Sequence, residues 1–108
     1  MALKSTKQYE ARANIAKSLA HPSRLMLLDA LKNGPTCVSD LTEFVGSDQS
    51  TVSKHLAILR QAGLVDVEKD GAMSYYRVNC PCLDDFFTCI ENVLRRNLKA
   101  HQAAVARR

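Results

Sequence analysis

The stretch between residues 36 and 63 limits the possible folds of this chain more than any other part. Its first half, TCVSDLTEFVG, predicts a short helix that opens near Thr36 and stops at Gly46, since glycine readily adopts the left-handed conformation that ends helices. After a three-residue turn, Asp48 can cap a second helix in QSTVSKHLAILRQAG. Its inward face is formed by three apolar residues, Val52, Leu56 and Leu59. Two short helices joined by a turn that contains glycine are typical of a helix-turn-helix unit.

Amphipathic helices are predicted on both sides of this unit. Ahead of it, EARANIAKSLA repeats an apolar residue at every fourth position, and SRLMLLDALKNG forms a strongly apolar helix that opens near Pro22. Behind it, DFFTCIENVLRRNLKA is expected to follow a cap at Asp84. The apolar stripes of the first and last helices exceed what one small core can cover, so we expect them to meet a second copy of the chain.

A β-hairpin is predicted between the helix-turn-helix unit and the last helix. Two short strands, Leu64 to Glu68 and Met73 to Val78, are joined by a turn at Asp70-Gly71. Because the chain shows no internal repeat or linker, residues 1–108 are expected to form one domain, mainly α with a small β-hairpin. A hairpin directly after such a unit favours a winged helix-turn-helix, with the hairpin as the wing.

The outward side of the second short helix carries small polar groups and one positive charge. Gln49, Ser50, Ser53 and Lys54 point away from the predicted core. The major groove of DNA admits one α-helix, and short polar side chains let that helix approach base edges and phosphates. The formal net charge of +4 agrees with a nucleic-acid partner but is a weak signal alone. The pattern therefore predicts DNA binding, although winged helices also serve as protein-interaction modules.

Three segments resemble the ArsR/SmtB family of dimeric, metal-sensing winged helix-turn-helix repressors. They are LAHPSRLMLLDAL, DLTEFVGSDQSTVSKHLAILRQAGLV and DGAMSYYRV, and the likeness runs over nearly the whole chain. The resemblance implies a homodimeric repressor that binds double-stranded operator DNA. The DNA contacts that it implies on the recognition helix are Gln49, Ser50, Thr51, Ser53, Lys54 and His55. In the wing, Ala72 stands where the family often has an arginine, so Lys69 is the candidate wing contact.

Three of the four cysteines lie close together, in NCPCLDDFFTC. Thiolates select soft ions such as As(III), Sb(III), Cd(II), Pb(II) or Cu(I), and three sulfurs suit the pyramidal geometry of As(III). We therefore predict that Cys80, Cys82 and Cys89 bind an inducing ion, with As(III) as the first candidate and no organic cofactor. Since seven helical residues rise about 10.5 Å, Cys82 must lie in the loop before the helix that carries Cys89. The spacing is compatible with a site in one chain and with a site across the dimer.

By the family resemblance, sensor ligands lie either on the third helix or on the last one. In TCVSDLT only Cys37 remains of the third-helix motif, with Ser39 and Thr42 where further thiols often stand. We therefore expect Cys37 to be a small buried hydrophobe. The family's last-helix zinc pattern of carboxylates and histidines is also missing, which moves the expected ligand set toward sulfur.

Two other functions compete with a metal-released repressor. A thiol redox or reactive-sulfur switch would pair Cys89 with Cys80 or Cys82, because Cys80 and Cys82 are too close along the chain for an unstrained bridge. An enzyme is not expected, because the sequence has no nucleophile elbow, phosphate loop or catalytic metal spacing. The first residues resemble neither a secretory signal nor a membrane span, so we expect a cytoplasmic protein with reduced thiols.

Overall fold

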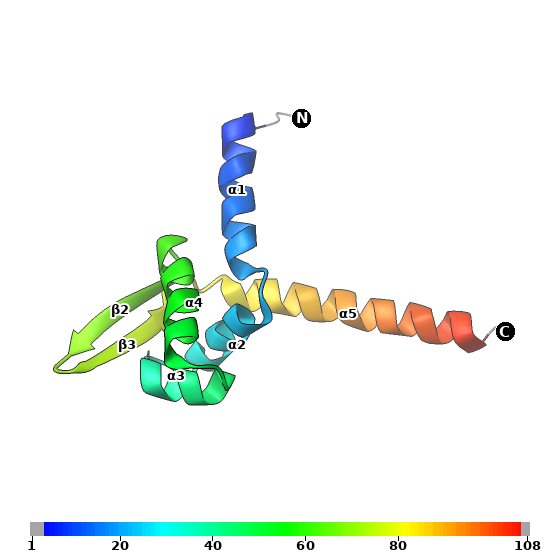
Figure 1. The fold of residues 1–108 in the computed structure, drawn as a ribbon. Coiled ribbons are helices and arrows are strands. Elements are labelled where there is room, and N and C mark those ends of the chain that lie inside the picture. The colour runs from blue at the N-terminus through cyan, green and yellow to red at the C-terminus, as the bar shows by residue number, and fades with distance from the viewer. Residues whose placement is uncertain (1–3, 107–108) are drawn as a thin grey trace.

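The computed structural model describes residues 4–106, which form a helical body, a hairpin and two projecting helices (Figure 1). In Figure 1, α2, α3 and α4 pack together beside the hairpin, while α1 and α5 extend away from this body in different directions. The elements in chain order are α1 (Thr6–Leu19), α2 (Pro22–Leu31), β1 (Thr36–Cys37), α3 (Val38–Val45), α4 (Gln49–Gln61), β2 (Val65–Asp70), β3 (Met73–Val78) and α5 (Leu83–Ala106). This order confirms the predicted class, mainly α with a small β-hairpin.

Capping side chains and a glycine set most of the helix ends. His21 and Asp48 each accept a hydrogen bond from a backbone N–H in the first turn of α2 and α4, respectively. α1 begins earlier than the periodic segment, at a capping box centred on Ser5. Gly46 ends α3 with φ at 79°, in the left-handed region that glycine adopts without strain. The cap at Asp48 and the stop at Gly46 were predicted from the sequence, whereas the caps at Ser5 and His21 were not.

A short strand that no sequence pattern predicted joins the hairpin. Thr36 and Cys37 form β1, which pairs antiparallel with Tyr76 and Tyr75 of β3, so that the strand order is β1-β3-β2. α3 consequently begins at Val38 and not near Thr36. The reason is that the open edge of β3 offers backbone hydrogen-bond partners to the residues that would otherwise open the helix.

The hairpin turn lies slightly later than predicted. Gly71 and Ala72 form the turn, because Asp70 and Met73 are still paired with each other. Gly71 adopts a positive φ of 63°, which a tight turn of this kind requires. The wing is therefore longer by one paired position than the sequence pattern indicated.

The last helix also begins differently from the prediction. α5 starts at Leu83, and the carbonyl of Cys82 accepts the first helical hydrogen bond from the backbone N–H of Phe86, at 3.3 Å. Asp84 is therefore not the cap but lies in the first turn, where a negative charge interacts favourably with the helix dipole.

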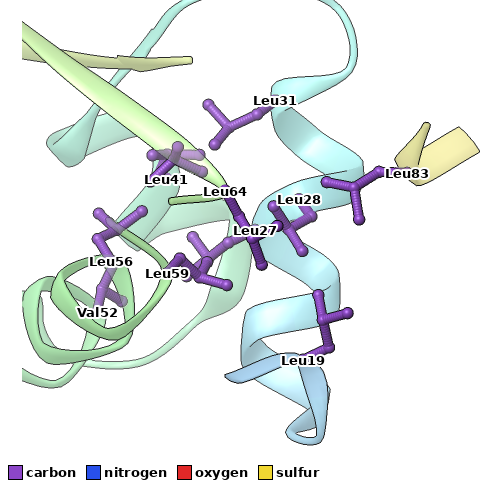
Figure 2. Packing of buried hydrophobic residues seen from close by; sticks show 11 residues of the cluster. Leu19, Leu27, Leu28, Leu31, Leu41, Val52, Leu56, Leu59, Leu64 and Leu83 are labelled. Atoms are coloured by element: carbon purple, nitrogen blue, oxygen red, sulfur yellow. The ribbon is translucent and has the colours of Figure 1, made fainter. Parts of the chain in front are cut away.

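A cluster of leucines and valines holds the body together (Figure 2). Side chains from α2, α3 and α4 meet at its centre, and Leu83 joins it from the start of α5. The members that are fully buried are Leu27, Leu28, Leu41, Val52, Leu56, Leu59 and Val65. Because burial of each such side chain contributes about 1.5–3 kcal/mol, this cluster fixes how α4 sits on α2 and α3.

The projecting helices leave apolar side chains uncovered. On α5, Leu94 and Leu98 are 56% and 57% exposed, and on α1 Ile15 is 45% exposed. None of the helices within residues 4–106 is long and apolar enough to cross a membrane. An uncovered apolar surface on two long helices points to contact with another protein chain.

Candidate functional site

The structure presents most of the predicted DNA-contacting residues of α4 to solvent. Asp48 fixes the start of the helix, and the buried stripe of Val52, Leu56 and Leu59 fixes its rotation about its own axis. The exposed members of the predicted set are Gln49, Ser50, Ser53 and Lys54, while Thr51 is half-buried. α4 thus offers a row of short polar groups and one cation, which suits an approach to the major groove.

The Asp48 carboxylate organises the first turn of α4. It accepts hydrogen bonds from the backbone N–H of Thr51 at 2.7 Å and from the hydroxyl of Ser50 at 3.0 Å. The backbone bond from Thr51 is the main reason that the pKa of Asp48 is lower than usual, with the Ser50 hydroxyl adding to it. Because Ser50 donates to Asp48, its oxygen lone pairs are the groups left for a nucleic-acid partner.

His55, which was also predicted to contact DNA, faces the body of the protein. Its Nδ1 lies 3.2 Å from Nη1 of Arg24, and its ring centroid lies 4.3 Å from that of His21. Burial lowers the pKa of His55, and His21 and Arg24 lower it further, so the ring is neutral at neutral pH. His55 therefore connects α4 to the start of α2, and its contact with DNA stays a prediction.

The wing carries charges of both signs. Lys69, the predicted wing contact, is exposed near the tip between Glu68 and Asp70. Closer to the base of the hairpin, Asp66 lies 3.9 Å from Nη2 of Arg77. Acidic neighbours weaken the attraction of a single lysine for phosphate, so we expect α4 to supply most of the contact energy. The role of Lys69 stays a prediction.

The structure brings two of the three predicted sensor thiols together. The sulfurs of Cys80 and Cys82 lie 2.6 Å apart in the loop before α5. A turn closed by the backbone N–H of Leu83 and the carbonyl of Cys80, at 3.2 Å, folds both side chains to the same side. The hydrogen bond with Cys80 raises the pKa of the Cys82 thiol, and slight desolvation of this exposed side chain raises it further. The redox hypothesis expected a pair with Cys89, and the structure instead brings Cys80 and Cys82 into contact because of this turn.

Cys89 lies apart from the other two thiols, on the exposed side of α5. It borders a shallow hollow together with Val93 and Arg96. Within residues 4–106 no sulfur contact joins it to Cys80 or Cys82, and no three Cys, His, Asp or Glu side chains are grouped so that they could hold a metal ion. One protomer therefore offers two assembled thiols, and a three-sulfur site requires a second chain or a movement of the loop.

The remaining cysteine, Cys37, belongs to the core. Only 6% of its surface is exposed, where β1 meets α3. This burial confirms the expectation that Cys37 is a small buried hydrophobe.

Two basic residues, Arg24 on α2 and Lys32 directly after it, connect functional elements and were not singled out by any sequence pattern. Arg24 donates hydrogen bonds to the carbonyls of Ser18 at 2.6 Å and Lys17 at 3.2 Å, at the end of α1. Nζ of Lys32 lies 3.5 Å from a carboxylate oxygen of Asp84, in the first turn of α5. The favourable position of a cation near a helix C-terminus is the one general signal that could have pointed to Arg24.

The chain is similar in sequence to known transcriptional regulators. The family model described as "Bacterial regulatory protein, arsR family" matches residues 21–67, from the start of α2 into β2. The HTH-type transcriptional regulator NmtR of Mycobacterium tuberculosis is 47% identical over 64 residues, which are 59% of this chain and 53% of NmtR. The uncharacterized HTH-type transcriptional regulator Rv0081 of the same species is 31% identical over 104 residues, or 95% of this chain and 91% of Rv0081. The chain thus spans about half of NmtR but nearly all of Rv0081.

Solved structures confirm the fold over almost the whole chain. The crystal structure of Rv0081 superposes with a TM-score of 0.80 at 32% identity and covers 90% of this chain and 98% of its own. The solution structure of a fragment of Mb0332 from Mycobacterium bovis gives a TM-score of 0.75 at 29% identity, covering 94% and 96%. That fragment is described as a homodimeric winged helix-turn-helix DNA-binding domain of a possible ArsR-family transcriptional regulator. The predicted winged helix-turn-helix architecture is therefore confirmed.

Proposed function

Because this chain belongs to the ArsR family of winged helix-turn-helix transcriptional regulators, we propose that it is a repressor released from operator DNA by a soft, thiophilic ion. As(III) and Sb(III) are the first candidates for this ion, followed by Cd(II) and Pb(II). The observation that carries the choice of ion class is the contact between the Cys80 and Cys82 thiols, 2.6 Å apart in the loop before α5. Thiolate sulfur binds such ions in preference to harder ones.

In this proposal α4 enters the major groove of the operator. Lys54 supplies a positive charge for the phosphate backbone, and Ser53 and Gln49 offer polar groups to base edges. The buried stripe and the Asp48 cap hold α4 in one orientation before any DNA is bound. Binding then requires little reordering of this helix, which favours affinity.

Two copies of the chain act together on the DNA in this proposal. The exposed side chains of Leu94 and Leu98 on α5, with Ile15 on α1, form an apolar surface that a second copy would cover. The homodimeric description of the Mb0332 fragment supports this assembly. A symmetric dimer would present its two α4 helices to half-sites about 34 Å apart, one turn of the double helix.

Cys89 is proposed as the third thiol, contributed across the dimer. It borders the same hollow of α5 as Val93, whose side chain is 43% exposed and belongs to the uncovered apolar surface. A partner that covers this surface would approach Cys89, whereas the chain's own loop holds only Cys80 and Cys82 together. Three sulfurs would then be available to one ion at the dimer boundary.

The position of the loop connects ion binding to α4 in three steps. The loop joins α5, α5 contacts α2 through Lys32, and α2 packs against α4 in the core. The loop leads directly into α5, and Lys32 joins the first turn of α5 to α2 through Asp84, at 3.5 Å, and Phe87, whose ring centroid lies 5.3 Å away. An ion can shift the dimer only by binding its DNA-free form more tightly than its DNA-bound form. A coupling of about 1–3 kcal/mol would reduce DNA affinity by roughly five- to 150-fold.

Titration of the reduced, DNA-bound protein with arsenite tests the ion site. We expect new ultraviolet absorption from sulfur-to-ion bonds together with release of DNA. Cys82→Ser and Cys89→Ser should abolish release and leave DNA binding intact, whereas Cys37→Ser, the matched control, should change release little. Loss of the response in Cys37→Ser alone, with the other two variants unaffected, would place the sensor at the start of α3 and overturn the proposal.

A mixed dimer distinguishes a site across the chains from a site within one chain. Cys82→Ser and Cys89→Ser chains, carrying different tags, are refolded together and the mixed dimer is purified. A site across the dimer leaves one intact set of Cys80, Cys82 and Cys89, so the mixed dimer binds one ion. A site within one chain leaves no intact set, and the mixed dimer then binds none.

A thiol redox switch is a second candidate function, favoured by the same contact between Cys80 and Cys82. Hydrogen peroxide would oxidise the two thiols to a disulfide, which their spacing of two residues would strain and make easy to reduce again, and would itself be reduced to two molecules of water. This function predicts that peroxide releases DNA in the absence of any ion, and that mass spectrometry finds two hydrogens missing from the peptide that contains both cysteines. Release by peroxide that persists in Cys89→Ser would favour this function over the three-sulfur site.

A further inference from the structure

Side chains and backbone groups from three helices meet where α4 touches α1 and α2. The residues of this junction are Ser18 and Lys17 at the end of α1, His21 and Arg24 at the start of α2, and His55 on α4. Each of the three side chains His21, Arg24 and His55 is half-buried, so solvent screens their interactions only in part. The proposed function leaves this α1–α2–α4 junction without a role.

Arg24 holds the junction together with three nitrogen atoms. Its Nε donates to the Ser18 carbonyl at 2.6 Å, its Nη2 donates to the Lys17 carbonyl at 3.2 Å, and its Nη1 lies 3.2 Å from Nδ1 of His55. A guanidinium group only donates hydrogen bonds, so Nδ1 of His55 must accept and carry no proton. The contact therefore exists only when the His55 ring is neutral.

His21 is under the same constraint. Its Nδ1 accepts a hydrogen bond from the backbone N–H of Ser23 at 3.0 Å, which caps α2 and requires an unprotonated nitrogen. Its ring also lies against that of His55, with the centroids 4.3 Å apart. A proton on His55 would therefore place an N–H group against the cation of Arg24 and a positive ring against His21.

The charged groups around His55 all disfavour its protonation. From α2 these are Arg24 and His21, while α1 contributes the backbone carbonyls of Lys17 and Ser18, which accept from Arg24. Burial, His21 and Arg24 all lower the pKa of His55, and within residues 4–106 no carboxylate contributes in the other direction. The structure thus favours the neutral ring for reasons of both hydrogen bonding and charge.

We propose that Arg24 and His55 are positioning residues for DNA binding, which hold α4 against the ends of α1 and α2 while His55 is neutral and release that hold when His55 is protonated. The inference rests on the proposed role of α4 in the DNA interface. Since the loosened form takes up a proton more readily than the DNA-bound form, affinity for DNA falls as the pH falls through the titration of His55. A histidine that contacts phosphate has the opposite effect, because protonation would strengthen its contact.

The sign of this pH dependence is measured with the full-length protein. The probe is a DNA duplex selected from a random pool by the wild-type protein at pH 7.5, and affinity is measured by fluorescence anisotropy at pH 7.5 and 5.5 at constant ionic strength. We expect the wild-type affinity to fall by about three- to tenfold over this range, as uptake of one proton per protomer allows. His55→Gln keeps an oxygen that can accept from Arg24 but does not titrate, so the ratio of its affinities at pH 7.5 and pH 5.5 should be much closer to one than the wild-type ratio.

Three further variants assign the effect to the junction. His101→Gln, at an exposed position of α5, should retain the pH dependence of the wild type. His21→Asn keeps a side chain that can cap α2 without titrating, and reports how much of the effect belongs to His21. Arg24→Gln should lower affinity about tenfold at pH 7.5, roughly what loss of a charged hydrogen bond costs, with a helix content by circular dichroism equal to that of the wild type.

Different failures overturn different statements. A wild-type affinity that rises at pH 5.5, with the rise lost in His55→Gln, would make His55 a phosphate contact and overturn the positioning role. A fall that is equally large in His55→Gln would overturn it as well. A wild-type protein that selects no duplex at pH 7.5 would overturn the DNA interface itself, and the positioning role with it.

Discussion

The helices α4 and α5 carry the same kind of apolar stripe, but only α4 has its stripe covered. Val52, Leu56 and Leu59 of α4 have no exposed surface, while Leu94 and Leu98 of α5 are more than half exposed. Apolar periodicity shows that a helix needs a partner and does not say where that partner comes from. For α4 the partner is the chain's own core, and for α5 we infer a second copy.

The same contrast holds for the functional groups on the two helices. The polar face of α4 is set by a cap, a buried stripe and the junction with Arg24, all within one protomer. The thiols near α5 are exposed at Cys82 and Cys89, and only Cys80 and Cys82 are in contact. A switch requires a region that can change its arrangement at a small energetic cost, and the start of α5 meets that requirement better than α4 does.

The largest effect is expected when one leucine is removed from the apolar stripe of α4 and, separately, from that of α5. This tests whether only the stripe of α4 is covered within the protomer. Leu56→Ala opens a cavity in the core and should lower the free energy of unfolding by about 2–5 kcal/mol, whereas Leu98→Ala should lower it by much less. Urea unfolding of both variants at one fixed protein concentration measures the difference. Equal losses at a protein concentration where the chain is monomeric would mean that Leu98 of α5 is as deeply packed in the protomer as Leu56 of α4.

A charge on the uncovered stripe should separate the two copies. Leu98→Glu is expected to give a folded monomer whose DNA affinity is lower by about 100-fold, because the two half-sites are no longer bound together. Sedimentation velocity measures the association, and Asn97→Glu is the control, since it adds the same charge to the neighbouring position of α5. A wild-type protein that is already monomeric at micromolar concentration would contradict the inference.

A smaller effect is expected from the exposed face of α4. Lys54→Ala should weaken DNA binding by roughly fivefold for all sequences and reduce the slope of log affinity against log salt by about one, because a phosphate contact is lost. Ser53→Ala should instead change which bases are preferred. Anisotropy titrations at several salt concentrations check the first effect, and selection from a random pool checks the second. Unchanged affinity and selectivity in both variants would refute the assignment of α4 as the recognition helix.

The smallest effect concerns the cap of α4 at acidic pH. The folded state lowers the pKa of Asp48, so the stability that its carboxylate contributes is fully present above the usual carboxylate pKa and is lost as the pH falls through the lowered value. Asp48→Asn keeps a capping group that does not titrate, so the melting temperature of this variant should fall less between pH 5 and pH 3 than that of the wild type. Parallel curves would show that the cap contributes little to stability.

Local signals in the sequence were enough for most of the fold. The proline at 22, the cap at Asp48, the glycines at 46 and 71, and the apolar repeats each act within a few residues, so the elements follow from short segments of sequence. The outward position of Gln49, Ser53 and Lys54 follows as well, because the buried stripe of α4 fixes the opposite face. The fold class and the candidate DNA-contacting face were therefore predictable.

The remaining features depend on residues that are distant in the sequence or on a turn that carries no periodic signal. The two residues of β1 become a strand only because β3 has an open edge beside them. His55 faces Arg24 because α4 packs on α2, and two residues so far apart in the chain share no local pattern. Cys80 and Cys82 meet through one backbone turn, while Cys89 is carried away on α5. Sequence determined which segments form helices and strands because propensities and caps act locally, whereas only the packing of those segments decided which side chains meet.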